Sequence, residues 1–227
     1  MSAEARRRAY LEALDIDVWT PRGADPAGAM EEVEVAPQAL TTDWDGLRQQ
    51  VAACTLCSLH RSRTQTVFGV GNQAADWMIV GEAPGAEEDQ RGEPFVGRAG
   101  KLLDEMLRAV GLQRDAVFIA NILKCRPPNN RDPLVEEASS CRAYLERQIQ
   151  LAAPKLILAV GRVAAQHLLG SDAPVGRLRG QKHTLNGGQL PVVVTYHPAY
   201  LLRSPTQKRK VWQDLCMARQ IMEQPDQ

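Results

Sequence analysis

The 227-residue sequence has no apolar run that approaches the roughly 18 residues needed to span a membrane as a helix. Its first residues, MSAEARRR, are not followed by the apolar stretch typical of a secretory signal. Hydrophobic residues make up 44% and charged residues 24% of the chain, as in ordinary globular proteins. We therefore expect a cytoplasmic protein with no membrane contact.

The sequence also lacks net charge, because 27 basic residues balance 27 acidic ones. Bulk composition therefore does not indicate a nucleic-acid-binding protein. Bases do gather locally at 177–182 and 203–210, and such patches can bind phosphate at zero net charge. From charge alone, ordinary solvated surface remains the favoured interpretation of both patches.

Cysteine is scarce, with five in the chain, and structural disulfides are not expected in a reducing compartment. Cys54 and Cys57 form a C-x2-C pair, whose two thiolates can reach one metal from a single turn. Cys125 and Cys141 complete a set of four that suits either zinc or an iron–sulfur cluster, and spacing alone does not choose between them. Two buried thiols would explain the second pair equally well, and Cys216 has the pattern of an ordinary helical cysteine.

The chain divides into two regions by composition. Residues 1–43 form an N-terminal extension, with a short helix expected at 3–14 and a disordered linker rich in Pro, Ala, Gly and acidic residues at 20–43. An arm that binds a replication or repair protein is one interpretation of this extension. Residues 44–227 form the compact domain, which is long enough to bury a sizeable core.

Within this domain, strand-like apolar runs alternate with helix-like segments, which predicts an α/β fold with a parallel sheet covered on both faces. The strands are expected at 77–80, 116–120, 156–160 and 191–196, and the helices at 99–110, 134–151, 162–169 and 207–223. Ligands bind beyond the carboxyl ends of parallel strands. Because Asn121 and His197 follow two such ends, we expect an amide and an imidazole to converge on one small polar ligand.

Several motifs, in order along the chain, resemble family 4 uracil-DNA glycosylases from about residue 44 to the C-terminus. They are GEAPGAEED at 81–89, GEPFVGRAG at 92–100, NILKCRPP at 121–128, HPAYLLR at 197–203 and the four cysteines. The resemblance implies a three-layer α/β/α sandwich around a four-stranded parallel sheet. It also implies a 4Fe-4S cluster on Cys54, Cys57, Cys125 and Cys141, and a monomeric enzyme that hydrolyses the N-glycosidic bond of uracil in DNA.

The chemistry of that reaction predicts a role for three residues that match the motifs. A glycosylase flips its target base into a pocket, where the ring of Phe95 is expected to stack on it. The amide of Asn121 can accept a hydrogen bond from uracil N3–H and donate one to O4. His197 can donate to O2, where negative charge grows as the bond breaks.

The loop at 81–85 is expected to border the base, because Gly81, Ala83 and Gly85 let the backbone approach a ligand closely. A Gly-rich loop between strand and helix would alone also suit a nucleotide-binding enzyme, but this one matches neither common phosphate-binding signature. The main alternative to the glycosylase is a non-catalytic, metal-stabilised DNA-binding or polymerase accessory module.

Glu82 and Glu88 are the predicted catalytic carboxylates. By resemblance, Glu88 crowds the C5 edge of the base and excludes the thymine methyl group, while Glu82 borders uracil and the attacking water. Another family of uracil glycosylases has an aspartate where this chain has Pro84. We therefore expect stabilisation of the transition state to carry more of the rate than a general base.

The segment after His197 is expected to contact DNA. Leu201 or Leu202 can wedge into the duplex, and Arg203 can bind a phosphate, although a buried leucine pair would explain the same sequence. Bases at 208–210 add salt-sensitive phosphate contacts. The stretch 125–132 contains no histidine that could trap the abasic site, so ordinary hydrolytic turnover is expected.

Overall fold

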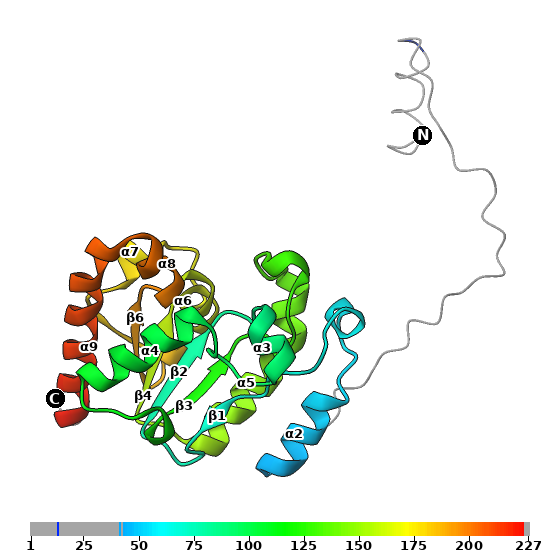
Figure 1. Ribbon diagram of the computed structural model, residues 1–227, viewed down its shortest axis with the longest axis horizontal. Helices are drawn as coiled ribbons and strands as arrows, with labels where there is room; N and C mark the ends of the chain where they lie inside the picture. Colours follow the sequence, from blue (N-terminus) through cyan, green and yellow to red (C-terminus); the bar gives the residue numbers. More distant parts are fainter. Residues whose placement is uncertain (1–12, 14–40, 42, 225–227) are drawn as a thin grey trace. The chain divides into compact units, whose positions relative to one another are not determined.

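The computed structural model describes residues 13, 41 and 43–224 (Figure 1). The chain divides at Gln38 into two units, and the fold described below is that of the second. The predicted helix at 3–14 and linker at 20–43 lie almost wholly outside the described residues. None of the helices in the described ranges is long and apolar enough to cross a membrane.

The centre of the domain is a six-stranded mixed sheet with the order β1-β3-β2-β4-β6-β5. Its strands are β1 (Val70–Gly71), β2 (Trp77–Gly81), β3 (Phe118–Asn121), β4 (Leu156–Val160), β5 (Lys182–Thr184) and β6 (Pro191–Thr195). The four predicted strands form its parallel centre, β3-β2-β4-β6. The prediction of a four-stranded, wholly parallel sheet is wrong, because two short antiparallel strands, β1 and β5, close its edges.

Eight α-helices are resolved between residues 43 and 224, and the helices predicted at 99–110, 134–151, 162–169 and 207–223 are among them. They are α2 (Trp44–Ala52), α3 (Ala86–Arg91), α4 (Arg98–Ala109), α5 (Val135–Ala152), α6 (Arg162–Leu169), α7 (Val175–Leu178), α8 (Pro198–Arg203) and α9 (Lys208–Glu223). Asp43 caps α2, since its carboxylate accepts a hydrogen bond from the Gly46 amide at 2.8 Å.

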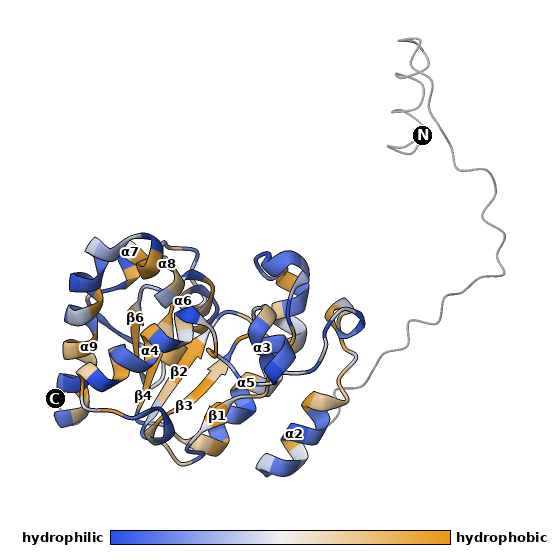
Figure 2. Ribbon diagram, in the orientation of Figure 1, coloured by the Kyte–Doolittle hydropathy of each residue, from blue (hydrophilic) through white to orange (hydrophobic). Residues whose placement is uncertain are grey.

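Helices cover both faces of the sheet and make three layers (Figure 1). Along β2, Met78 and Val80 face a core shared with α2, α5, α6 and α7, whereas Trp77 and Ile79 face a core shared with α4, α8 and α9. This alternation follows from the two-residue period of a strand. The central strands β2, β4 and β6 are accordingly apolar along most of their length, while the helices are polar on their outer sides (Figure 2). The predicted α/β/α sandwich is confirmed.

Candidate functional site

A cleft of about 500 Å³ lies at the carboxyl ends of the parallel strands. Its size is within the roughly 300–1,000 Å³ typical of small-ligand pockets. Strand ends bring the loop after β2, Asn121 and His197 to it, as the topology predicts. Its walls consist of Glu82, Ala83, Pro84, Gly85, Glu88, Phe95, Ala99, Asn121, Pro127, Asn130, Arg131, His197, Ala199, Tyr200 and Arg203.

Asn121 and Phe95 meet beside Gly81. A Cβ atom on Gly81 would lie 2.4 Å from Asn121 Oδ1 and 2.6 Å from Phe95 Cζ, so only glycine leaves room for both groups. Asn121 is 2% exposed, and its Oδ1 has no hydrogen-bond partner among the described residues. Because an unpaired buried acceptor is costly, this oxygen is suited to receive a donor from a ligand.

Phe95 forms the floor of the cleft. Its φ of +54° is in the left-handed region, which is uncommon for a bulky residue and is found chiefly at functional sites. The backbone of Gly100 packs against this turn, because a Cβ on Gly100 would lie within 1.7 Å of Phe95 O. The ring is 6% exposed and stacks on the His197 ring.

His197 follows β6 and caps α8. Its Nδ1 accepts a hydrogen bond from the Ala199 amide at 3.1 Å, which places the proton of the neutral ring on Nε2. Burial, with a smaller contribution from Arg203, lowers the pKa of His197 to about 4. His197 is therefore a neutral imidazole at neutral pH, with Nε2–H available as a donor.

A buried network anchors β6, the strand that precedes His197. Thr195 Oγ1 donates to Asp214 Oδ2 at 2.8 Å, and Arg179 donates to both oxygens of the same carboxylate at 2.7 and 3.0 Å. Asp214 is fully buried and Arg179 is only 14% exposed. Asp214 therefore ties both β6 and Arg179 to α9, and Arg179 does not belong to a freely solvated basic patch.

Both predicted carboxylates line the cleft. Burial raises the pKa of Glu82, Asp132 raises it further, and Arg162 opposes both effects. Arg162 also forms an ion pair with Asp132. Glu88 lies close to Gly85, where a Cβ would come within 2.6 Å of Glu88 Oε2. The loop geometry thus places two carboxylates beside the space above Phe95.

One rim of the cleft is formed by residues 127–131, none of which was predicted as a site residue. Asn129 and Asn130 both adopt left-handed φ angles of 54° and 53°. Arg131 donates to both oxygens of Glu137 at 2.6 and 2.8 Å, and these bonds hold the pKa of Glu137 below its usual value. The Pro-Pro-Asn-Asn sequence is typical of a turn. The position of that turn beside the cleft depends on the bonds between Arg131 and the buried Glu137.

The two leucines predicted to contact DNA both lie on α8, but they differ in burial. Leu201 is 1% exposed and packs in the core with α4 and α9, whereas Leu202 is 40% exposed. The assignment of Leu201 as a wedge is therefore wrong, because its side chain is part of the hydrophobic core. Leu202 retains that prediction, and the exposed Arg203 lines the cleft beside it.

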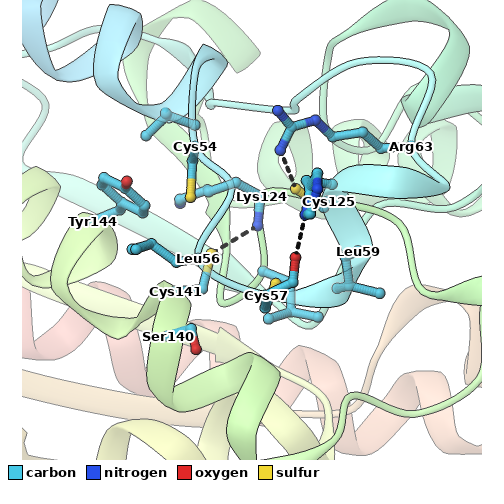
Figure 3. A pocket seen from close by; sticks show the side chains of 13 residues that line it. Cys54, Leu56, Cys57, Leu59, Arg63, Lys124, Cys125, Ser140, Cys141 and Tyr144 are labelled. Carbon is cyan, nitrogen blue, oxygen red and sulfur yellow. Dashed lines mark hydrogen bonds between the residues drawn. The ribbon is translucent and has the colours of Figure 1, made fainter. Parts of the chain in front are cut away.

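Cys54, Cys57, Cys125 and Cys141 line one small second cavity, with Leu56, Leu59 and Tyr144 among its walls (Figure 3). Arg63 Nη1 donates to Cys125 Sγ at 3.2 Å, and the Lys124 amide donates to Cys141 Sγ at 3.3 Å. In the part of the chain that is described, no three His, Cys, Asp or Glu side chains form a ready metal centre. The four thiols thus share a cavity without a preformed coordination geometry.

The chemistry of these thiols fits a cluster site. Burial raises the pKa values of Cys57 and Cys125, and that of Cys141 to about 12. A buried thiolate is stable only beside positive charge, which a metal supplies as it displaces the protons. Four soft sulfur donors with two N–H groups directed at them suit an iron–sulfur cluster.

The other three histidines and Cys216 lie away from the cleft. His60 Nδ1 is 2.7 Å from Cys57 O, and His183 Nε2 is 2.6 Å from Leu178 O. His167 lies on α6, where burial lowers its pKa, and Cys216 is half-buried on α9. None of the four lines the cleft, and the position of Cys216 within α9 agrees with the ordinary helical cysteine predicted for it.

Comparison with known proteins agrees with this architecture. The sequence model of the Uracil DNA glycosylase superfamily matches residues 68–216, which contain all six strands of the sheet and every residue that lines the cleft. The chain belongs to the uracil-DNA glycosylase superfamily.

Its similarity is to the type-4 branch of that superfamily. The type-4 uracil-DNA glycosylase of Archaeoglobus fulgidus is 45% identical over 71% of this chain and 84% of its own length. The type-4 enzyme of Thermotoga maritima is 42% identical over 77% of this chain and 92% of its own length. The type-4 enzyme of Sulfurisphaera tokodaii is 40% identical over 77% of this chain and 83% of its own length.

Proposed function

We propose that this chain is a monofunctional uracil-DNA glycosylase that releases free uracil from DNA and leaves an abasic site. The observation that carries the proposal is the buried, unpartnered Oδ1 of Asn121 at the edge of a cleft floored by Phe95. Uracil offers N3–H to that oxygen and O4 to the amide nitrogen. Cytosine offers an acceptor at N3 and a donor at N4, so both bonds would be mismatched.

The reaction breaks the bond between C1′ and N1, and the bonding electron pair leaves with the base. His197 Nε2–H donates to O2 and stabilises the resulting anion without transferring its proton, because the ring is already neutral. Water adds to the cation-like C1′ and loses a proton, and uracil takes up a proton on release. Glu82 orients this water and stabilises the sugar cation.

Glu88 supports selection against thymine, since its carboxylate lies on the same wall as the loop at 81–85. Leu202 and Arg203 lie next to the mouth of the cleft, where a wedge and a phosphate contact would stabilise a flipped nucleotide. We assign these functions to residues 44–227.

We further propose that Cys54, Cys57, Cys125 and Cys141 hold a 4Fe-4S cluster. When bound, the cluster supplies a cross-link rather than redox chemistry, because hydrolysis transfers no electrons. The cysteines come from the loop after α2, the segment after β3 and helix α5. Joining them fixes the start of the rim loop 127–131 beside the cleft.

Two measurements test the proposal. Incubation with a uracil-containing oligonucleotide should release free uracil, and a thymine-containing strand of the same sequence should release no base. DNA binding without base release would instead favour the non-catalytic module. Iron and acid-labile sulfide should each approach four per chain, as a 4Fe-4S cluster requires, whereas stoichiometric zinc would contradict the cluster.

A further inference from the structure

Lys124 is an unusual feature of the core. It is 1% exposed, although lysine is almost never fully buried without a charged partner. Its Nζ donates to the backbone oxygen of Asn121 at 2.8 Å and to Gln148 Oε1 at 2.6 Å. Both acceptors are neutral, so within the described chain these bonds satisfy two of its three donors without compensating its charge.

Lys124 lines the same cavity as Cys54, Cys57, Cys125 and Cys141. Figure 3 draws Lys124 together with all four cysteines of the second cavity. A buried ammonium is stabilised when an anion lies close by in the same low-dielectric interior. Four thiolates around an iron–sulfur core carry net negative charge, and they would supply that anion here.

The backbone of Lys124 is fixed as firmly as its side chain. Its amide donates to Cys141 Sγ at 3.3 Å, and its carbonyl accepts from the Val67 amide at 2.8 Å. Between Asn121 and Lys124 the chain continues along β2, because the amides of Ile122 and Leu123 donate to Gly81 O and Glu82 O at 2.9 and 3.0 Å.

Residues 121–125 thus form a short hook with a cleft residue at one end and a cysteine at the other. The Lys124 ammonium closes this hook by binding the carbonyl of Asn121. The carbonyl and the side chain of Asn121 are attached to the same Cα atom, so this bond helps to fix the backbone that carries the Asn121 side chain. A continuous, hydrogen-bonded segment thus joins a cysteine to the group that faces the ligand.

We infer that Lys124 is a positioning residue that couples the four-cysteine site to Asn121, so that loading of the cluster and binding of uracil strengthen each other. This inference rests on the proposed function, because it takes Asn121 as the residue that reads uracil. Coupling of this kind is reciprocal: if the cluster favours uracil binding, uracil must favour retention of the cluster by the same factor.

The test compares iron-loaded wild type with Lys124→Met, which keeps the length of the side chain and removes its charge and donors. Lys155→Met is the matched control, since Lys155 lies before β4, at the amino end of the sheet, and pairs with Asp76 on the surface. We expect Lys124→Met to bind free uracil about 10-fold more weakly and to lower kcat by about 10- to 100-fold. KM for DNA should be nearly unchanged, because the phosphate contacts are elsewhere.

The reciprocal measurement is the rate of iron loss to a chelator with and without saturating uracil. Uracil should slow this loss several-fold in wild type and Lys155→Met, and should have no effect in Lys124→Met. A variant that binds uracil as wild type does, or is protected by uracil equally well, overturns the inference. A merely structural lysine would lower the melting temperature without removing this protection.

A second variant covers the case in which Lys124→Met does not fold. Gln148→Glu places a carboxylate against the ammonium, so the lysine no longer depends on the cysteines for charge compensation. We expect Gln148→Glu to bind uracil as wild type does, while uracil slows its loss of iron less than in wild type. If uracil slows iron loss equally in both proteins, the coupling is contradicted. If iron-loaded wild type releases no uracil from DNA, the proposed function fails separately, whereas normal release with an unaffected Lys124→Met refutes only the coupling.

Discussion

The rings of Phe95 and His197 stack with their centroids 5.5 Å apart and their planes inclined by 29°. The floor of the cleft and its hydrogen-bond donor are therefore one packed unit. Gly81 on one side and Gly161 on the other leave room for it, since a Cβ on Gly161 would lie 3.0 Å from His197 Cβ. This packing covers part of the imidazole, and such burial favours its neutral form.

Stability should depend on pH through His197. Its pKa is lowered from 6.5 to about 4, so between these values the unfolded chain binds a proton that the folded protein does not. Stability is therefore fully present above pH 6.5 and declines as the pH falls toward 4, by about 1 kcal/mol per pH unit from this residue. Urea unfolding of wild type and His197→Gln across this interval should show a flatter profile for the variant. Parallel profiles would contradict the buried neutral ring.

Gly81→Ala should impair catalysis more than stability. The added methyl group displaces Asn121 Oδ1 and the Phe95 ring, and a shift of about 1 Å in such groups can cost about 100-fold in rate. Overpacking should destabilise the fold by about 1–3 kcal/mol. Gly176→Ala is the control, because its Cβ would make only an ordinary 3.7 Å contact with Tyr196 Oη. Single-turnover excision and thermal unfolding measure the two effects, and a fully active Gly81→Ala would argue against this geometry.

Glu88→Ala should relax discrimination against thymine. Removing the carboxylate opens space on the wall at 85–88, and a methyl-sized difference in a pocket changes selectivity by about 10- to 200-fold. The ratio of uracil to thymine release should fall by at least about 10-fold. Glu87→Ala serves as the control because Glu87 is exposed and does not line the cleft. If Glu88→Ala and Glu87→Ala had the same ratio of uracil to thymine release, Glu88 would not be the residue that excludes thymine.

Alanine substitutions at the two leucines of α8 should have different effects, with Leu201→Ala lowering stability and Leu202→Ala lowering activity on duplex DNA. Leu201→Ala should cost about 2–5 kcal/mol of folding free energy, as expected for a core leucine. Leu202→Ala should change stability by less than about 0.5 kcal/mol, while excision from duplex DNA falls and excision from a single strand is retained. Loss of activity on both substrates to the same extent would mean that Leu202 is not a wedge.

The central strands were predictable because each is a short, buried apolar run that ends in a glycine or a polar residue. The edge strands were not, because β1 has two residues and β5 is polar and largely exposed. Neighbouring Leu201 and Leu202 could not be told apart by composition. The phase of α8 separates them, since Leu201 lies three residues after the buried Pro198 and shares its side of the helix.

The strand-end residues of the cleft followed from topology, whereas its rim did not. The position of residues 127–131 depends on a bidentate ion pair between Arg131 and Glu137, which no local pattern reveals. Lys124 was missed for a related reason. From sequence alone, a lysine is expected at the protein surface. Only the fold shows that Lys124 is buried, between Asn121 and the cysteines.

The role of Asn121 is tested most directly by release of free uracil by iron-loaded wild type and Asn121→Ala under single-turnover conditions. Wild type should release uracil rapidly from uracil-containing DNA and should release no thymine or cytosine. A folded Asn121→Ala should be at least about 100-fold slower, because a site built to pair with a substrate N–H depends on that contact. Absence of uracil release by the wild type, or a rate in Asn121→Ala close to that of the wild type, would contradict the proposed role of Asn121.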